Sequence, residues 1–87
     1  MSEYKPDIAI HPGKTLCEAM ETINVSIRKM SLTTCMSEDT IEGIIVGRKP
    51  ITRESAIALA KFFGMSVEFW INLQKNYDET VRSLKNG

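Results

Sequence analysis

The chain has 87 residues, of which 43% are hydrophobic and 25% charged, and its 11 basic residues balance its 11 acidic ones. We expect a single domain spanning residues 1–87; so short a chain buries only about 60–65% of its unfolded surface, so a second subunit would add stability. No apolar run approaches the roughly 18–20 residues that cross a bilayer, and the N-terminus lacks a signal-peptide core, so we expect a cytoplasmic protein with no membrane partner.

Residues able to carry catalysis or hold a metal are few. Cys17 and Cys35 form no CxxC pair, and His11 is the only histidine that could join them. A structural zinc site usually needs four ligands, and a reducing cytosol disfavours a disulfide. The sequence also lacks a nucleophile–base set and a glycine-rich phosphate loop. It therefore predicts no enzyme, no metal and no cofactor.

Start and stop signals predict an all-α chain of five helices, because the β-branched residues fall within helical periods rather than in alternation. Residues 1–10 are expected to form an extended lead-in. The first helix begins at Pro12, where the missing N–H is harmless, with His11 positioning its start, and it ends near Asn24. Its predicted apolar face consists of Leu16, Met20 and Ile23.

Two short helices follow. Ser26 is expected to cap the second helix, which carries Met30 inward and ends near Cys35. Ser37 is expected to cap the third, which Gly47 ends. The apolar face of the third helix consists of Ile41, Ile44 and Ile45.

The last two helices are longer. Thr52 caps the fourth, which Gly64 ends, and Ser66 caps the fifth, with residues 78–87 as a C-terminal helical extension. The fourth helix presents Ala56, Leu59, Ala60 and Phe63, and the fifth presents Trp70, Leu73, Tyr77, Val81 and Leu84.

The apolar stripe of the fifth helix has two parts. Aromatic residues at helical spacing, such as Trp70 and Tyr77, are first of all core candidates. Val81 and Leu84 extend the stripe beyond what four short helices can cover, which suggests a partner surface. We therefore predict a symmetric homodimer whose interface includes Tyr77, Val81 and Leu84.

Residues 26–47 contain two short capped helices joined by a tight turn. This pattern is typical of a helix-turn-helix module, whose second helix enters the major groove with its N-terminal residues against base edges. Many small helical bundles share the pattern, so by itself it does not establish DNA binding.

Three motifs make the pattern more specific. They are His-Pro-Gly at 11–13, Gly-Arg-Lys-Pro-Ile-Thr at 47–52, and Ser-Val-Glu-Phe-Trp-Ile-Asn-Leu-Gln-Lys-Asn-Tyr-Asp at 66–78, the most specific of the three. Together they resemble the HigA/VapI-type antitoxins of the Xre-like (lambda-repressor-like) helix-turn-helix class. The resemblance covers residues 11–78. It implies a five-helix fold, a homodimer bound to double-stranded operator DNA upstream of its own genes, and neutralisation of a RelE/HigB-like, mRNA-cleaving toxin.

The resemblance also implies which residues meet DNA. Residues 37–46 would form the recognition helix, with the basic side chains of the following loop beside the phosphates. The predicted DNA-binding residues are Arg28, a basic side chain nearby in the module, together with Ser37, Glu38, Asp39, Thr40, Glu42, Gly43, Arg48 and Lys49. Lys29 and Arg53 are further phosphate candidates, although so short a basic run can also be merely solvated.

The sequence departs from the family where DNA would be read. Residues 37–46 carry three acids and no base, whereas residues 47–53 carry three bases and no acid. The family commonly has basic or neutral polar groups in the groove, a Gln where Ile27 stands, and a Gly where Cys35 stands. A non-glycine residue in the left-handed region costs about 1 kcal/mol, so we expect a strained or altered turn at Cys35.

The acidic side chains Glu38, Asp39 and Glu42 allow three interpretations. Carboxylates can accept a hydrogen bond from the cytosine amino group. They can instead only stabilise the helix N-terminus. They can also repel phosphates and abolish DNA binding.

Two functional hypotheses follow. The first is a sequence-specific transcriptional repressor and antitoxin of a HigBA-type system. The second is a protein-interaction module on a helix-turn-helix scaffold that has lost DNA binding, because a fold does not fix a function.

Overall fold

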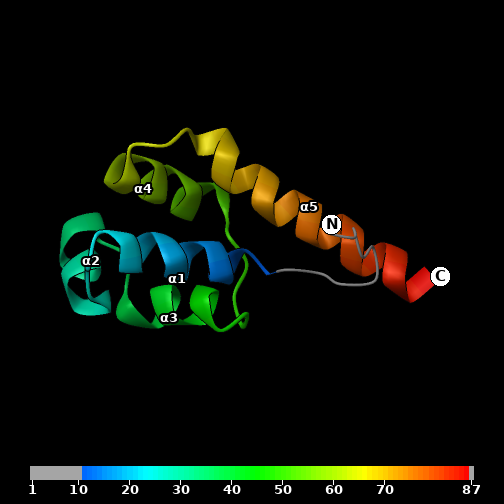
Figure 1. The fold of residues 1–87 in the computed structure, drawn as a ribbon, viewed down its shortest axis with the longest axis horizontal. Helices are drawn as coiled ribbons and strands as arrows, with labels where there is room; N and C mark the ends of the chain where they lie inside the picture. Colours follow the sequence, from blue (N-terminus) through cyan, green and yellow to red (C-terminus); the bar gives the residue numbers. More distant parts are fainter. Residues whose placement is uncertain (1–10, 87) are drawn as a thin grey trace, which may run out of the picture.

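The computed structural model describes residues 11–86, and their backbone forms five α-helices and no strand (Figure 1). The predicted all-α, five-helix fold is confirmed, and each helix begins directly after the residue expected to precede or cap it. The lead-in predicted for residues 1–10 lies outside the described part of the chain. The helices are α1 (Pro12–Thr22), α2 (Ile27–Thr34), α3 (Glu38–Ile45), α4 (Arg53–Phe63) and α5 (Val67–Asn86).

Each helix begins at a side chain that accepts a hydrogen bond from an otherwise unpaired backbone N–H. At α1 the acceptor is the Nδ1 atom of His11, 2.9 Å from the Gly13 nitrogen. At the other four helices it is a hydroxyl that accepts from the N–H three residues later. These hydroxyls belong to Ser26, Ser37, Thr52 and Ser66. Such a cap typically contributes about 1 kcal/mol, which explains why local signals placed the helix starts well.

The turn between α2 and α3 is strained at Cys35, as predicted. This residue has φ 66° and ψ 12°, in the left-handed region. Two hydroxyls hold the turn: Ser31 Oγ donates to the Met36 carbonyl at 2.6 Å, and Thr34 Oγ1 accepts from the Met36 N–H at 3.2 Å. These bonds fix the angle between the two helices without a glycine.

The core lies between all five helices, and α5 contributes through its first half. Its largest fully buried side chains come from all five helices: Leu16, Met30, Ile41, Ile44, Leu59 and Trp70. The Trp70 ring packs against Phe63 and Phe69, at centroid distances of 5.7 and 5.2 Å. One prediction was wrong, because Ile23 lies beyond the end of α1 as its C-cap and is 52% exposed.

The backbones of α1 and α3 approach each other closely at Gly13. A Cβ atom at Gly13 would meet the Ile44 carbonyl oxygen and would lie 2.5 Å from the Ile45 carbonyl oxygen. Only glycine fits between these backbones. Gly13 therefore fixes the depth at which α3 sits against α1.

Helix α5 is the longest element, and its C-terminal half projects beyond the other helices (Figure 1). Val81 is half-buried, and Leu84 is 40% exposed. Across residues 11–86, none of the helices combines the length and the apolar character that crossing a bilayer requires.

Candidate nucleic-acid interface

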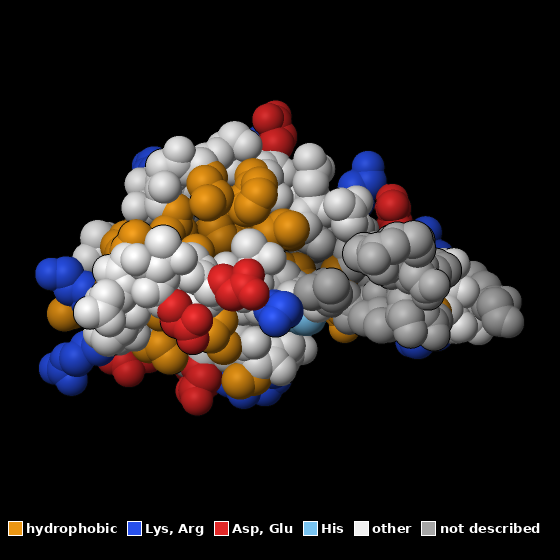
Figure 2. Space-filling model, viewed as in Figure 1, with side chains coloured by type: hydrophobic (Ala, Val, Ile, Leu, Met, Phe, Trp, Pro, Cys, Tyr) orange, Lys and Arg blue, Asp and Glu red, His pale blue; other side chains and the backbone are white. Residues whose placement is uncertain are grey.

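Helices α2 and α3 form the two-helix unit predicted from the sequence. The inner side of α3 carries Ile41 and Ile44, both fully buried, and its outer side carries Glu38, Asp39 and Glu42, all exposed. The visible face in Figure 2 intermingles acidic and basic side chains and has an apolar area above them. That face therefore presents no large area of one charge.

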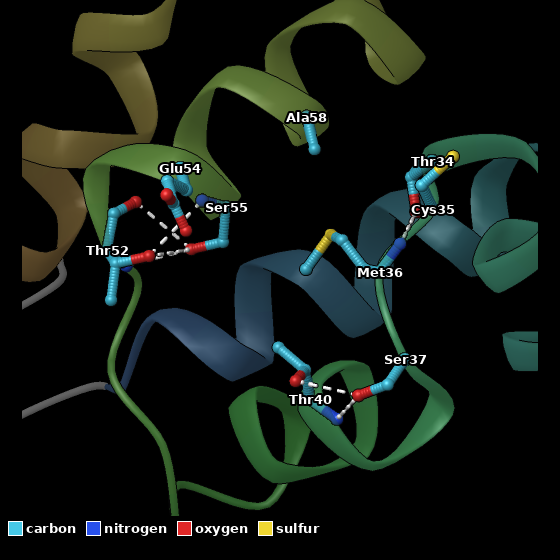
Figure 3. A pocket seen from close by; sticks show the side chains of 9 residues that line it. All are labelled: Thr34, Cys35, Met36, Ser37, Thr40, Thr52, Glu54, Ser55 and Ala58. Atoms are coloured by element: carbon cyan, nitrogen blue, oxygen red, sulfur yellow. Dashed lines mark hydrogen bonds between the residues drawn. The ribbon is translucent and has the colours of Figure 1, made fainter.

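A shallow hollow of about 340 Å³ lies between the α2–α3 turn and the start of α4 (Figure 3). Its hydroxyl groups are already engaged in local hydrogen bonds, most of them at helix caps. Ser37 Oγ donates to Thr40 Oγ1 at 2.8 Å, and Thr52 and Ser55 form a reciprocal capping box. The lining contains one carboxylate, from Glu54, and one thiol, from Cys35. The hollow thus brings together the starts of α3 and α4 rather than a set of reactive groups.

The loop after α3 turns back along that helix. Gly47 has φ 86°, a conformation that favours glycine, and it reverses the chain. The backbone N–H groups of Arg48 and Lys49 then both donate to the Gly43 carbonyl, at 2.7 and 2.9 Å. These two hydrogen bonds to one carbonyl oxygen fix the direction in which the two basic side chains leave the loop.

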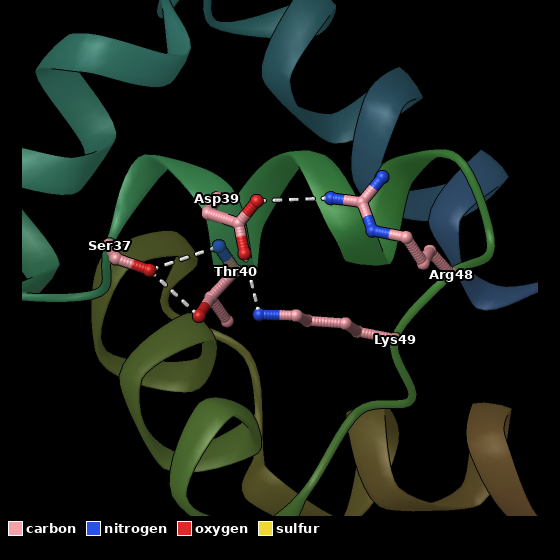
Figure 4. Close-up of polar contacts among 5 residues, drawn as sticks. All are labelled: Ser37, Asp39, Thr40, Arg48 and Lys49. Carbon is pink, nitrogen blue, oxygen red and sulfur yellow. Dashed lines mark hydrogen bonds and ion pairs between the residues drawn. The ribbon is translucent and has the colours of Figure 1, made fainter.

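Both basic side chains reach the same carboxylate (Figure 4). Arg48 Nη2 lies 3.2 Å from Asp39 Oδ1, and Lys49 Nζ lies 2.8 Å from Asp39 Oδ2. The hydrogen bond from Lys49 and the charges of both cations lower the pKa of Asp39 below its ordinary value. All three side chains are substantially exposed, so solvent and salt screen these ion pairs.

Gly43 differs from its prediction as a groove-facing residue. It is buried, and a Cβ atom there would lie 2.8 Å from Cγ and 2.9 Å from Cδ of Lys49. The aliphatic stem of Lys49 therefore crosses over Gly43 on its way to Asp39. The missing side chain at Gly43 provides the path for the lysine.

The other predicted DNA contacts are accessible to different degrees. Glu38 and Glu42 are exposed, and neither has an ion pair with any residue between 11 and 86. Arg28 and Lys29 in the first turn of α2 are exposed, as is Arg53 at the start of α4. Ser37 is exposed and Thr40 is half-buried.

The predicted dimer residues lie along α5. Tyr77 is half-buried, and its ring packs edge-on against His11 at a centroid distance of 4.8 Å. Part of Tyr77 thus serves to hold α5 against the start of α1. Val81 and Leu84 lie further along, where α5 leaves the rest of the molecule.

Sequence reasoning missed two connections that span the chain. It assigned Asp39 to the groove but did not identify it as the partner of the loop cations. It also did not identify Gln74, whose Oε1 accepts from the Ile51 N–H at 2.7 Å and so ties the loop to α5. The opposite charges at positions 39, 48 and 49 were a visible signal, but their meeting depends on the turn at Gly47.

This arrangement is that of an Xre-like helix-turn-helix domain. The second helix of its two-helix unit, α3, has a charged outer face. Comparisons with known proteins place the chain more narrowly. The HTH-type transcriptional regulator YddM of Escherichia coli is 32% identical over 63 residues, which are 72% of this chain and 67% of that protein. The chain spans about two thirds of the length of the curated relatives it matches. No family model matches it.

Solved structures of other proteins are similar to this chain both in sequence and in fold. An addiction module antidote protein of the HigA family from Coxiella burnetii is 35% identical, with a TM-score of 0.84 over 90% of this chain and 85% of that one. The antitoxin HigA of Pseudomonas aeruginosa, solved with the higBA promoter, is 30% identical, with a TM-score of 0.87 over 92% of this chain and 88% of that one. The chain belongs to the HigA family of antitoxins.

Proposed function

We propose that the chain is a DNA-binding antitoxin that represses its own operon. The outer side of α3 would enter the major groove, while Arg48 and Lys49 lie beside the phosphates. The observation that carries this proposal is the match of its fold to the Pseudomonas aeruginosa antitoxin solved with its promoter. The loop cations held along α3 support it, because basic side chains beside a groove-bound helix can contact the flanking phosphates. The expected cytoplasmic location suits this function.

Fluorescence anisotropy tests this directly. The wild-type chain is titrated against DNA from upstream of its own gene and against a scrambled duplex, at two salt concentrations. We expect tighter binding to the upstream DNA, weakening on both duplexes as salt rises. Arg48→Ala/Lys49→Ala should weaken both, whereas Lys61→Ala/Lys85→Ala, which removes the same charge elsewhere, should weaken them less.

The second hypothesis, a protein-interaction module, is favoured by the exposed carboxylates of Glu38 and Glu42 and by the zero net charge. The same titration distinguishes this hypothesis from DNA binding. If the wild-type chain selects neither duplex even at low salt, DNA binding is rejected and a basic protein partner becomes the better explanation.

Toxin neutralisation is the second part of the proposal and follows from membership of an antitoxin family. The partner would be a RelE/HigB-like, mRNA-cleaving protein encoded beside this chain. We expect co-purification of the two products and inhibition of RNA cleavage when the chain is added in equal amount. Cleavage that continues in a stable complex would reject neutralisation.

We also propose that the chain acts as a homodimer through α5. The exposed end of this helix, with Val81 and Leu84, supports a contact between two copies. Sedimentation should show that Val81→Asp/Leu84→Asp is monomeric. Asn76→Asp/Ser83→Asp adds the same charge at exposed positions of α5 and should stay dimeric. A dimer in both variants would reject this interface.

A further inference from the structure

The two basic side chains best placed to bind phosphate are already bound to a carboxylate. Arg48 and Lys49 each contact a different oxygen of Asp39, at 3.2 and 2.8 Å. Asp39 therefore occupies, in the free protein, the position of a phosphate group between the two cations. While Asp39 holds them, both cations share their charge and one N–H donor each with this carboxylate, so less of each is available to the DNA backbone.

The backbone keeps this arrangement in place. The Gly43 carbonyl accepts from both loop N–H groups, and the stem of Lys49 passes over Gly43 toward Asp39. The carboxylate itself is exposed in the first turn of α3, on the side opposite the buried Ile41 and Ile44. It can thus exchange partners without any movement of the core.

A carboxylate at such a position is costly to leave unpaired next to DNA. If the cations move to phosphates, Asp39 faces a strongly negative surface unless a donor replaces them. Base amino groups in the major groove are such donors, and the cytosine amino group is the usual partner of a carboxylate.

We propose that Asp39 determines specificity by exchanging partners. On the operator it would release Arg48 and Lys49 to the phosphates and accept a hydrogen bond from a base amino group. On other sequences no amino group is in place, so the cations stay with Asp39 and contribute less. This inference rests on the proposed DNA-binding function and adds the residue that discriminates between duplexes.

Asp39→Asn is the test variant, measured by anisotropy on operator and scrambled duplexes. Freeing the cations should tighten binding to the scrambled duplex and steepen its salt dependence by about 0.9, the value for one further phosphate neutralised. The ratio of operator to scrambled affinity should fall by at least about fivefold, since an amide no longer discriminates as the carboxylate does.

Glu38→Gln provides the matched control. It removes the same charge one position earlier, from a side chain without an ion pair in the described part of the chain. Its effect on the affinity ratio should be smaller than that of Asp39→Asn. Equal falls in the ratio would mean that net charge alone is responsible, and would overturn the proposal.

Other outcomes are equally informative. If Asp39→Asn weakens both duplexes by the same factor, Asp39 only positions the loop and the proposal is overturned. If the wild-type chain does not prefer the operator, the proposed function fails and this inference fails with it.

A measurement without DNA tests the pairing itself. By NMR, the pKa of the Asp39 carboxyl should be low in the wild type and should rise in Arg48→Gln/Lys49→Gln. An Asp39 pKa that is the same in both proteins would overturn the proposal regardless of any DNA result.

Discussion

The two sides of α3 contact very different neighbours. The inner side is packed against other helices through buried aliphatic groups and through Gly13, where two backbones meet without room for a Cβ atom. The outer side carries exposed charges, and the atoms nearest to the missing side chain of its glycine, Gly43, belong to the stem of Lys49. One side is thus fixed by backbone, and the other by side chains that can change partners. The packed inner side keeps α3 in a fixed position, and the exposed outer side leaves its charged groups able to bind other partners.

The sharpest test of this comparison is a glycine-to-alanine substitution on each side of α3, at Gly13 and at Gly43. We expect the larger loss in the free energy of unfolding at Gly13. Gly13→Ala would place a Cβ atom against the carbonyl oxygens of Ile44 and Ile45, so α1 has to move away from α3. We expect a loss of at least about 3 kcal/mol in the free energy of unfolding, at the upper end of overpacking effects. Urea denaturation followed by circular dichroism measures it. A loss below about 1 kcal/mol would show that the two backbones are not in rigid contact.

A smaller effect is expected from removing one methyl group on the inner side. Ile44 is fully buried, and Ile44→Val should lower the free energy of unfolding by about 1 kcal/mol through the cavity it leaves. The control is Val46→Ala just beyond the end of α3, where the side chain is 61% exposed. That variant should stay within about 0.5 kcal/mol of the wild type. Equal losses in both variants would contradict the division into two sides.

Gly43→Ala is the counterpart of Gly13→Ala on the outer side. Of Gly13→Ala, Ile44→Val and Gly43→Ala, it should change the free energy of unfolding least. Alanine gains helix propensity of up to about 1 kcal/mol, which offsets the displacement of the flexible Lys49 stem. We expect unfolding within about 1 kcal/mol of the wild type. The Asp39 pKa, measured by NMR, should rise toward its ordinary value as Lys49 is pushed aside. A loss as large as that of Gly13→Ala would mean that the outer side is rigid as well.

The smallest expected effect is a pH dependence from His11, the residue that caps α1 beside Gly13. Partial burial lowers the pKa of this imidazole below 6.5, against a smaller opposing effect of the Asp78 carboxylate. Because the protonated form is favoured in the unfolded chain, the free energy of unfolding should be constant above pH 6.5 and fall as the pH drops below that value. Protonation also removes the Nδ1 acceptor that caps α1.

The matched variant for this test is His11→Asn, which keeps a capping acceptor without a titrating group. Denaturation between about pH 7.5 and about pH 5.5 should show a decline in the wild type that the variant lacks. Parallel declines in both proteins would assign the pH dependence to other groups.

The inner side was largely predictable from the sequence, because its signals are local. Caps such as Ser26 and Ser37, and the spacing of Ile41 and Ile44, act within one or two helical turns. Ile23 was the exception: its helical spacing continued past the residue where the helix ends.

The outer side was not predictable in the same way. The contacts of Asp39 with Arg48 and Lys49 span nine and ten residues and depend on the reversal at Gly47. Gly43 was expected at the groove, but the path of the Lys49 stem covers it. Such contacts follow from where the loop returns, which no local pattern specifies. The charges were visible in the sequence, but their pairing was not.

The central claim is that the outer side of α3 and its following loop form the DNA-binding surface. The most direct measurement is an amide NMR spectrum of the labelled wild-type chain, recorded with and without the upstream duplex. The account predicts shift changes concentrated at Ser37–Thr40 and at Arg48 and Lys49. Changes confined to the C-terminal half of α5, with residues 37–49 unmoved, would contradict it.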